Sequence, residues 1–196
     1  MFNTIFPKIH KEGYRFIAIS VLLTFAALFF SKLLGLLLII ISIWVYYFFR
    51  DPERFSIDDD SYLVSPADGL ITDVSERSGP EELRLENTSF TRVSIFMNVF
   101  NCHVNRVPAS CKVEEIYYKP GKFLNASLDK ASEENERNFF KIISKKDNEE
   151  IVIVQIAGLI ARRIVCDVEQ GQDLKQGDRI GMIRFGSRVD IYFKNK

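Results

Sequence analysis

"RIGMIRFGSRVDIYF", residues 179–193, brings the chain to its end on two runs in which apolar and polar residues alternate. In the second run Val189, Ile191 and Phe193 occupy every other position, which places them on one face of a β-strand. A Gly-Ser pair, residues 186–187, separates the two runs and is by itself typical of a turn. The end of the chain is therefore predicted to be β structure.

Similar short runs, rich in β-branched and aromatic residues, recur from residue 62 onward. They read "YLVSP", "GLITDVS", "RVSIFMNV", "KVEEIYY", "NFFKIIS", "EIVIVQIAG" and "RIVCDV". Turn residues separate them, with turns expected at Gly171 and Gly177. This pattern predicts a mainly β domain, a sandwich or a barrel. The segment 125–138 is polar and charged, and we expect a solvated loop or a short helix there.

The first fifty residues have a different character. From Phe16 to Phe49 the only charge is Lys32. Such a length is too great for one crossing of a roughly 30 Å hydrocarbon core, whereas each half is slightly short for one. We therefore predict that residues 1–49 form a hydrophobic helical hairpin, turning near Ser31–Lys32, that anchors the protein in a membrane. The alternatives are a hairpin buried in a soluble protein and, less favoured without a cleavage site, a signal peptide.

Basic residues flank the apolar stretch on both sides. Lys8, Lys11 and Arg15 precede it, and Arg50 and Arg54 follow it. Because cytoplasmic flanks carry an excess of Lys and Arg, both ends of the hairpin are expected on the cytoplasmic side of the cell membrane. The charged connector "RDPERFSIDDDS" begins at residue 50, so the β-rich domain is expected to span residues 50–196 and to lie on that side too.

Composition excludes some classes of protein. The 26 Lys and Arg residues balance the 26 Asp and Glu residues, which argues against a nucleic-acid binder. The three cysteines, Cys102, Cys111 and Cys166, lack the pairing of a metal site, so no metal is expected. Their odd number fits a reducing compartment, in which each serves as a small buried apolar residue.

Three residues of the β domain could carry chemistry. His103, its only histidine, is expected at a strand end or in a loop, where it could transfer protons or be merely structural. Asp68, in a Pro-Ala-Asp-Gly turn, could orient His103 or simply form the turn. Ser187 follows Gly186, but the Gly-x-Ser-x-Gly pattern of a nucleophile elbow is absent.

Five sequence segments, which we call blocks, follow one another along the chain and include these residues. They are "SPADG" (65–69), "FMNVFNCHVNRVP" (96–108), "KASEENERN" (130–138), "VQIAGLIARRIV" (154–165) and "GDRIGMIRFGSRVD" (177–190). With these blocks the chain resembles the phosphatidylserine decarboxylase proenzyme family in its short, prokaryotic form. The resemblance covers most of residues 50–194.

The resemblance implies a carboxy-lyase that makes its own cofactor. Cleavage between Gly186 and Ser187 would yield a β chain, 1–186, and an α chain, 187–196, which stay together as a heterodimer. Ser187 would become a pyruvoyl group that forms a Schiff base with phosphatidylserine in the membrane, giving phosphatidylethanolamine and CO2. By the same resemblance Ser187, His103 and Asp68 are catalytic, with His103 as the proton donor; higher oligomers are left open.

Arginines inside the matching blocks are candidates for binding the substrate. Arg106, Arg162 and Arg163 could pair with its phosphate and carboxylate, or could simply be solvated. Longer members of the family carry a second histidine where this chain has Arg106. Either His103 therefore serves both self-cleavage and decarboxylation, or cleavage uses another base.

Two other functions compete with this interpretation. A membrane-tethered β domain without enzymatic activity, similar to lipoyl carriers, would suit the Gly-punctuated tail. It lacks the lysine that such carriers place at a hairpin tip, and it leaves His103 and "FGSRVD" unexplained. A pyruvoyl decarboxylase of a soluble amino acid would have no use for the hydrophobic hairpin.

Overall fold

A single residue joins the two helices near the start of the chain. The computed structural model describes residues 6–57, 59, 61–122, 134–158, 163–185 and 187–194. Helix α2 (Gly13–Phe30) ends, and helix α3 (Lys32–Phe48) begins, at Ser31. The Ser31 amide donates to the carbonyl of Ala27, and its Oγ accepts from the amide of Leu34, so the serine caps both helices. The predicted hairpin is confirmed.

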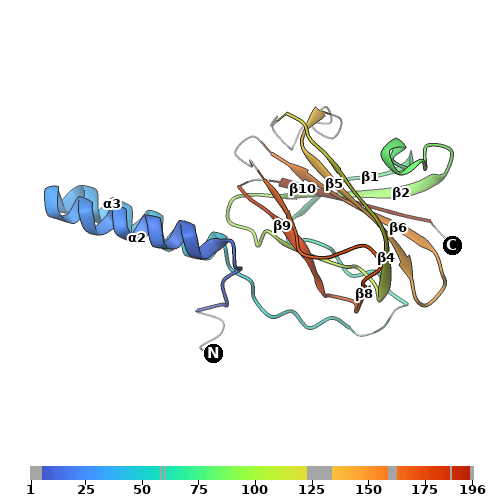
Figure 1. Cartoon of the computed structure of the whole chain (residues 1–196), viewed down its shortest axis with the longest axis horizontal. Coiled ribbons are helices and arrows are strands. Elements are labelled where there is room, and N and C mark those ends of the chain that lie inside the picture. The colour runs from blue at the N-terminus through green and yellow to red at the C-terminus, as the bar shows by residue number, and fades with distance from the viewer. Residues whose placement is uncertain are drawn as a thin grey trace. The chain divides into compact units, whose positions relative to one another are not determined.

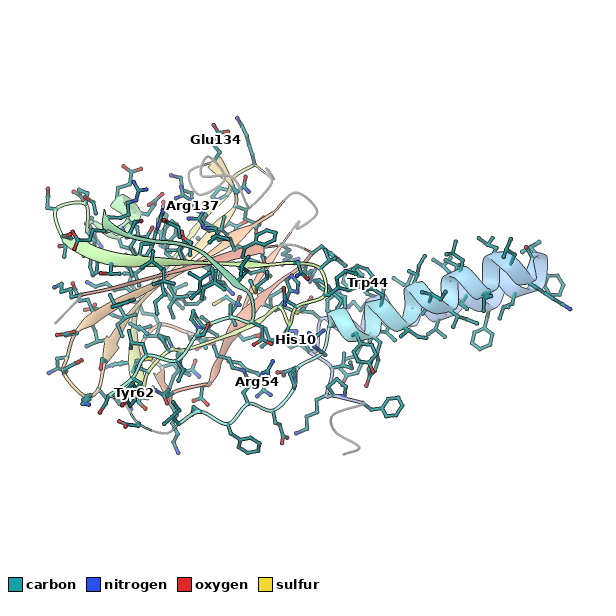
Figure 2. All side chains as sticks on the ribbon, turned by 180° about the vertical axis from the view of Figure 1, so that it is seen from behind. His10, Trp44, Arg54, Tyr62, Glu134 and Arg137 are labelled. Carbon is teal, nitrogen blue, oxygen red and sulfur yellow. The ribbon has the colours of Figure 1, made fainter. Side chains whose placement is uncertain are left out.

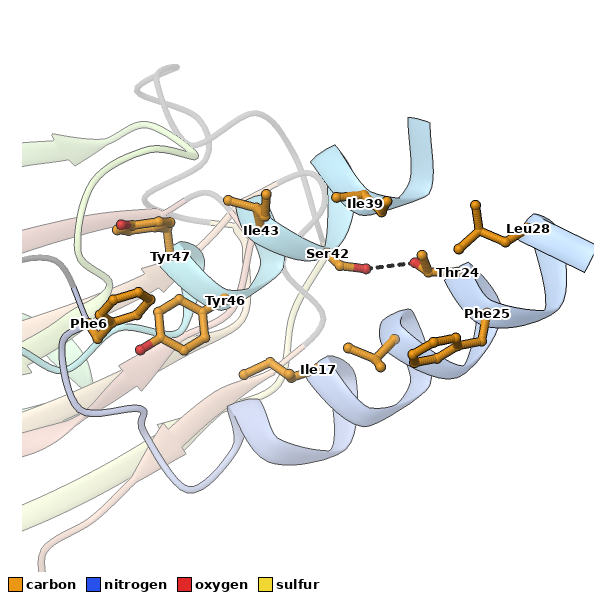
Figure 3. A pocket seen from close by; sticks show the side chains of 11 residues that line it. Phe6, Ile17, Thr24, Phe25, Leu28, Ile39, Ser42, Ile43, Tyr46 and Tyr47 are labelled. Carbon is orange, nitrogen blue, oxygen red and sulfur yellow. Dashed lines mark hydrogen bonds between the residues drawn. The ribbon is translucent and has the colours of Figure 1, made fainter. Parts of the chain in front are cut away.

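The two helices pack closely along an apolar groove (Figure 3). Thr24 Oγ1 lies 3.0 Å from Ser42 Oγ across this groove and donates to the carbonyl of Ser20 at 2.8 Å, so Ser42 is the donor of the bond between the helices. A side chain at Gly35 would overlap Leu28. Small residues and a satisfied polar pair thus let the helices approach each other.

Large apolar side chains project from the outside of the hairpin (Figure 2). Phe29, Phe30 and Leu33 are each at least 80% exposed. Helix α2 is long and apolar enough to cross a membrane, and α3, with 17 residues, is shorter. A core helix of a soluble protein would be mostly buried, whereas little of α2 is. This exposure fits association with a membrane and disfavours a hairpin buried in a soluble core.

Antiparallel strands build the rest of the structure. The chain divides into two compact units, Met1–Arg54 and Phe55–Lys196. The strands are β1 (Leu70–Ser78), β2 (Ser89–Met97), β3 (Val104–Arg106), β4 (Cys111–Lys119), β5 (Arg137–Ser144), β6 (Glu150–Ala157), β7 (Ile164–Cys166), β8 (Asp173–Leu174), β9 (Arg179–Ile183) and β10 (Ser187–Phe193), with the short helix η1 (Glu81–Leu83) after β1. They form a seven-stranded sheet, β1-β2-β10-β6-β5-β4-β8, and a three-stranded sheet, β3-β9-β7 (Figure 1). The prediction of a helical hairpin followed in sequence by a mainly β domain is confirmed.

Each face of the large sheet carries an apolar cluster. The main core joins one face to the small sheet, and contains Ile153 of β6 and Val189 of β10 together with Ile180 of β9. On the opposite face Phe139 and Val154 belong to a second cluster, which the segment around η1 supplies with Leu83 and Leu85. The two sheets therefore pack as a sandwich, and the middle of the large sheet is buried on both faces.

The last strand lies in the centre of the large sheet. Strand β10 pairs with β2 along one edge and with β6 along the other (Figure 1). Val189 and Ile191 are buried in the main core, and Phe193 packs against it, so the predicted common face of these three residues is confirmed. A segment of seven residues thus gains main-chain hydrogen bonds on both of its edges.

Two predictions about burial need correction. Within the segment 125–138, residues 125–133 lie outside the described residues, but Asn135 and Glu136 are buried rather than solvated, as are the first two residues of β5. Asn135 donates to the carbonyl of Ala157 at 2.7 Å, which satisfies its polar group inside the protein. Cys102 and Cys111 are buried as expected, whereas Cys166 is exposed because it ends β7 at the edge of the small sheet.

Candidate active site

Ser187 is the first residue of β10 and is fully buried. It lies opposite Met97 of β2 on one side and opposite Ala157 of β6 on the other. The Oγ of Ser187 is 3.9 Å from the Sδ of Met97. Gly186, its partner in the predicted cleavage site, lies outside the described residues. The sheet therefore holds the serine hydroxyl in a position shielded from bulk water.

Phe185, two residues before Ser187, has a left-handed backbone with φ of 59°. An aromatic residue rarely adopts this region, because its Cβ crowds the neighbouring backbone. Such a conformation costs about 1–3 kcal/mol and persists only where the surroundings impose it. The chain thus carries backbone strain directly before the predicted cleavage site.

His103 is buried between the end of β2 and the start of β3. Its Nδ1 is 3.0 Å from the carbonyl oxygen of Asn101. Since a carbonyl oxygen can only accept, Nδ1 carries the hydrogen, and a neutral ring in this tautomer has its lone pair at Nε2. The amide of Ile183, four residues before Ser187, donates to the carbonyl of His103 at 3.3 Å. The histidine is thus tied to the strand that leads to the serine.

Asp68 lies half-buried in the turn before β1. The amide of Arg106 donates to the carbonyl of Pro66 at 2.9 Å, which ties this turn to β3. A side chain at Gly69 would overlap the carbonyl oxygen of Phe96, so the turn also packs closely against the end of β2. These are the two strands that flank His103. The fold therefore brings Asp68, His103 and Ser187 to the same end of the sandwich.

A buried chain of amides approaches the serine from inside the core. Gln155 donates to the Oδ1 of Asn105 at 2.8 Å, and Asn138 donates to Gln155 at 3.5 Å. Asn105 in turn places its Nδ2 3.7 Å from the Sδ of Met97, the residue opposite Ser187. The sequence analysis missed this chain. Its signal was the polar Gln155 inside the otherwise apolar run 151–157.

The two candidate arginines that the structure describes lie in different surroundings. Arg106 donates from Nη1 to the carbonyl of Gly177 at 2.8 Å, so its guanidinium holds a turn. Arg163 is exposed, and its carbonyl accepts from the amide of Arg184 at 3.3 Å, which places it beside the segment leading to Ser187. Arg162 lies outside the described residues.

A buried ion pair follows the serine directly. Arg188 contacts Asp190 through two hydrogen bonds, Nε to Oδ1 at 2.6 Å and Nη2 to Oδ2 at 2.9 Å. Both side chains are almost completely buried on the face of the sheet opposite Ser187. The sequence analysis missed this pair, although residues two apart in a strand share a face.

Comparisons with known proteins identify the family of this chain. The family model described as phosphatidylserine decarboxylase matches residues 41–196. A phosphatidylserine decarboxylase proenzyme of Pelagibacter ubique is 63% identical over all of this chain and 90% of its own length. The corresponding proenzymes of Rickettsia typhi and Rickettsia prowazekii are each 51% identical over all of this chain and 84% of their own length. The chain belongs to the phosphatidylserine decarboxylase family.

The match to the phosphatidylserine decarboxylase family spans the whole β domain and the second half of α3. It therefore contains Asp68, His103 and Ser187, and the resemblance inferred from the five sequence blocks is confirmed. Within the described ranges, no three His, Cys, Asp or Glu side chains gather in a way that could hold a metal ion.

Proposed function

We propose that this protein is a self-processing carboxy-lyase that removes CO2 from phosphatidylserine and leaves phosphatidylethanolamine. Membership of the family supports the reaction class. The observation that carries the proposal is the buried position of Ser187 at the start of a central strand, directly after a strained segment. A serine in a simple surface turn would need neither feature.

Self-cleavage begins with attack of Ser187 Oγ on the carbonyl carbon of Gly186. The peptide bond to the serine nitrogen breaks and an ester forms in its place. Loss of the α proton of residue 187 then breaks the bond between Cβ and Oγ, so Gly186 leaves as a carboxylate and residue 187 becomes a dehydroalanine. Water replaces the amine of this residue, ammonia departs, and a ketone remains. The strain at Phe185 favours this sequence because cleavage frees the residue from its left-handed conformation.

The chain's residues fit the pyruvoyl group that this family uses. Ser187 is its source, and β2 and β6 hold the strand that would carry it after cleavage. When present, the group supplies an electron sink for decarboxylation, because its ketone can draw electrons from the substrate as CO2 leaves. Burial at the start of β10 keeps competing water away from this position.

His103 serves as the acid and base of the reaction. With Nδ1 held by the carbonyl of Asn101, its Nε2 can take up a proton and deliver it to the substrate carbon that loses CO2. Asp68, whose turn packs against the same strands, orients the histidine. Because the β domain has one histidine, we assign His103 to both steps.

Cationic residues bind the anionic headgroup. Of the two candidates that the structure describes, Arg163 is the better placed, because it is exposed beside the segment that leads to Ser187. Arg162 is its neighbour in sequence and remains a candidate. Arg106 already uses its guanidinium to hold the carbonyl of Gly177, so its contribution to substrate binding is smaller than that of Arg163.

The helical hairpin keeps the enzyme where its lipid substrate is concentrated. The exposed apolar side chains of α2 and α3 anchor the protein in the cell membrane, with the basic flanks and the β domain on the cytoplasmic side. Holding an enzyme at the bilayer surface raises the effective concentration of a headgroup substrate.

Mass spectrometry of the purified full-length protein tests the proposal. We expect two fragments, residues 1–186 and 187–196, the second bearing a ketone that borohydride reduces to a hydroxyl group. The cleaved protein should release CO2 from phosphatidylserine vesicles, whereas vesicles of phosphatidylcholine should release none. A chain that stays intact after prolonged incubation with phosphatidylserine contradicts the proposal.

A further inference from the structure

The ion pair of Arg188 and Asp190 lies in the second and fourth residues of the proposed short chain, 187–196. Two parallel hydrogen bonds join the guanidinium to the carboxylate, the strongest geometry available to such a pair. The side chains are 3% and 1% exposed. Both partners belong to the same side of the cleavage site, so cutting the chain leaves neither charge buried alone.

The pair is also tied to the long chain through β2. Arg188 Nη2 donates to the Oγ of Ser94 at 2.9 Å, and Asp190 lies directly opposite Ser94 in the sheet. Farther along, Tyr192 lies opposite Arg92, whose side chain bonds to it and also to Asp73 of β1 at 2.6 Å. Polar side-chain contacts thus extend from β1 through β2 into the short chain.

Burial of this ion pair needs a reason beyond stability. Removing two charges from water is costly, and apolar residues of similar volume often serve a core as well or better. A buried polar pair is best understood where it fixes one arrangement among several. Apolar alternation in β10 repeats every two residues, so it does not distinguish the observed pairing from one shifted by two. Only the observed pairing puts Asp190 opposite Ser94 and Tyr192 opposite Arg92.

A fixed pairing register matters most at the start of β10. A new chain end has lost its covalent restraint, and the ends of strands fray first. Reaction at residue 187 requires that its atoms stay within a few tenths of an ångström of the other catalytic groups. Arg188, the next residue, has a buried side chain that donates two hydrogen bonds to Asp190 and one to Ser94.

We propose that Arg188, Asp190 and Ser94 form a positioning clamp that fixes residue 187, first as the serine that is cut and then as the first residue of the short chain. The clamp acts through the backbone, because its side chains lie on the face of the sheet opposite Ser187. It rests on the proposed cleavage between Gly186 and Ser187.

A double variant without charges separates positioning from stability. In Arg188→Met/Asp190→Leu no buried charge is left unpaired, so the chain should fold and resist urea as the wild type does. We expect slower self-cleavage, a kcat lowered about tenfold or more at unchanged KM, and faster exchange of the short chain. Exchange is followed by mass spectrometry after an excess of synthetic 187–196 peptide labelled with heavy isotopes is added to the cleaved protein.

Two further variants keep the test decisive. Ser94→Ala removes only the side-chain hydrogen bond between Arg188 and β2. It should speed peptide exchange several-fold, whether or not the double variant folds. Lys145→Met/Asp173→Asn removes an exposed ion pair at the far edge of the sheet and should match the wild type. Wild-type rates of cleavage, exchange and turnover in a folded double variant overturn the clamp, as do wild-type exchange and kcat in Ser94→Ala.

The wild-type protein distinguishes failure of the clamp from failure of the proposed function. An intact wild-type chain contradicts the cleavage itself. A wild type that is cleaved and active, beside variants that behave identically, contradicts the clamp alone.

Discussion

The amide of Ile183 donates a hydrogen bond to the carbonyl of His103 at 3.3 Å, and so joins the histidine to the strand that precedes Ser187. Residues 80 positions apart in sequence thereby share one end of the sandwich. The proposed self-cleavage needs this proximity, because its proton carrier and its nucleophile must meet within one chain.

Ser187→Ala should abolish cleavage, because alanine has no oxygen to attack Gly186. The chain should remain full length on denaturing gels and by mass spectrometry, and it should release no CO2 from phosphatidylserine. Ser144→Ala removes a serine that is likewise buried, at the end of β5, and should be cleaved normally. Two fragments from Ser187→Ala would assign the nucleophile to another residue.

His103→Gln should lower kcat for decarboxylation by 10²–10⁴-fold, because glutamine fills the buried site but cannot carry the proton. CO2 release from phosphatidylserine vesicles measures this loss. Cleavage should slow as well, which time courses on gels would reveal. His10→Gln, which alters the other histidine of the chain, should keep wild-type turnover. Normal decarboxylation by His103→Gln would remove this residue from the mechanism.

Phe185→Gly should stabilise the precursor and slow its cleavage. Glycine adopts a φ of 59° without strain, so the variant loses the release of strain that favours the cut. A strain of about 1–2 kcal/mol corresponds to roughly a tenfold change in rate. Arg84→Gly relieves a residue with the same φ far from the site in sequence and should leave the half-time of cleavage unchanged. Cleavage of Phe185→Gly at the wild-type rate or faster contradicts a role for strain.

Tyr192→Phe should reduce the sensitivity of the fold to alkali. Burial raises the pKa of Tyr192, and the carboxylate of Asp190 adds to the rise. The unfolded chain ionises tyrosine near pH 10, whereas the folded chain keeps its proton longer, so stability is present below about pH 10 and falls as the pH rises further. Urea unfolding at pH 9 and pH 11 measures this fall.

The measurement is best made on the uncleaved Ser187→Ala chain, so that unfolding does not depend on protein concentration. The fall in the free energy of unfolding should be smaller in Tyr192→Phe than in its parent, and Tyr62→Phe, which alters an exposed tyrosine, should match the parent. Equal falls in all three proteins would show that ionisation of Tyr192 does not couple to folding.

Local sequence patterns predicted the helices and strands of this protein better than they predicted which strands pair with each other. The alternation of Val189, Ile191 and Phe193 identified a strand and its buried face, because side-chain direction depends on the strand alone. Its insertion between β2 and β6 was not predictable, since pairing between distant segments depends on the assembled sheet. The turn at Ser31 was predicted from a break in apolarity.

The candidate site likewise has features that the sequence predicted and features that depend on the assembled fold. Residue type and family blocks singled out Ser187, His103 and Asp68 as candidates, whereas the burial of Arg188 with Asp190 was missed. Charged side chains normally lie at the surface. Residue type alone therefore does not predict that Arg188 and Asp190 form an ion pair inside the sheet. The left-handed backbone of Phe185 was not predictable from the sequence either, because the surrounding fold imposes this conformation and the residue type does not.

Cys166 provides a test of the side on which the β domain lies. Its side chain is exposed, whereas Cys102 and Cys111 are buried, so a maleimide reports on this one thiol. The basic flanks of the hairpin predict a cytoplasmic domain. In bacterial spheroplasts a membrane-impermeant maleimide should therefore leave the protein unlabelled, and should label it once detergent opens the membrane. Cys166→Ser should stay unlabelled in both conditions, and labelling of the wild type in intact spheroplasts would place the domain on the outer side.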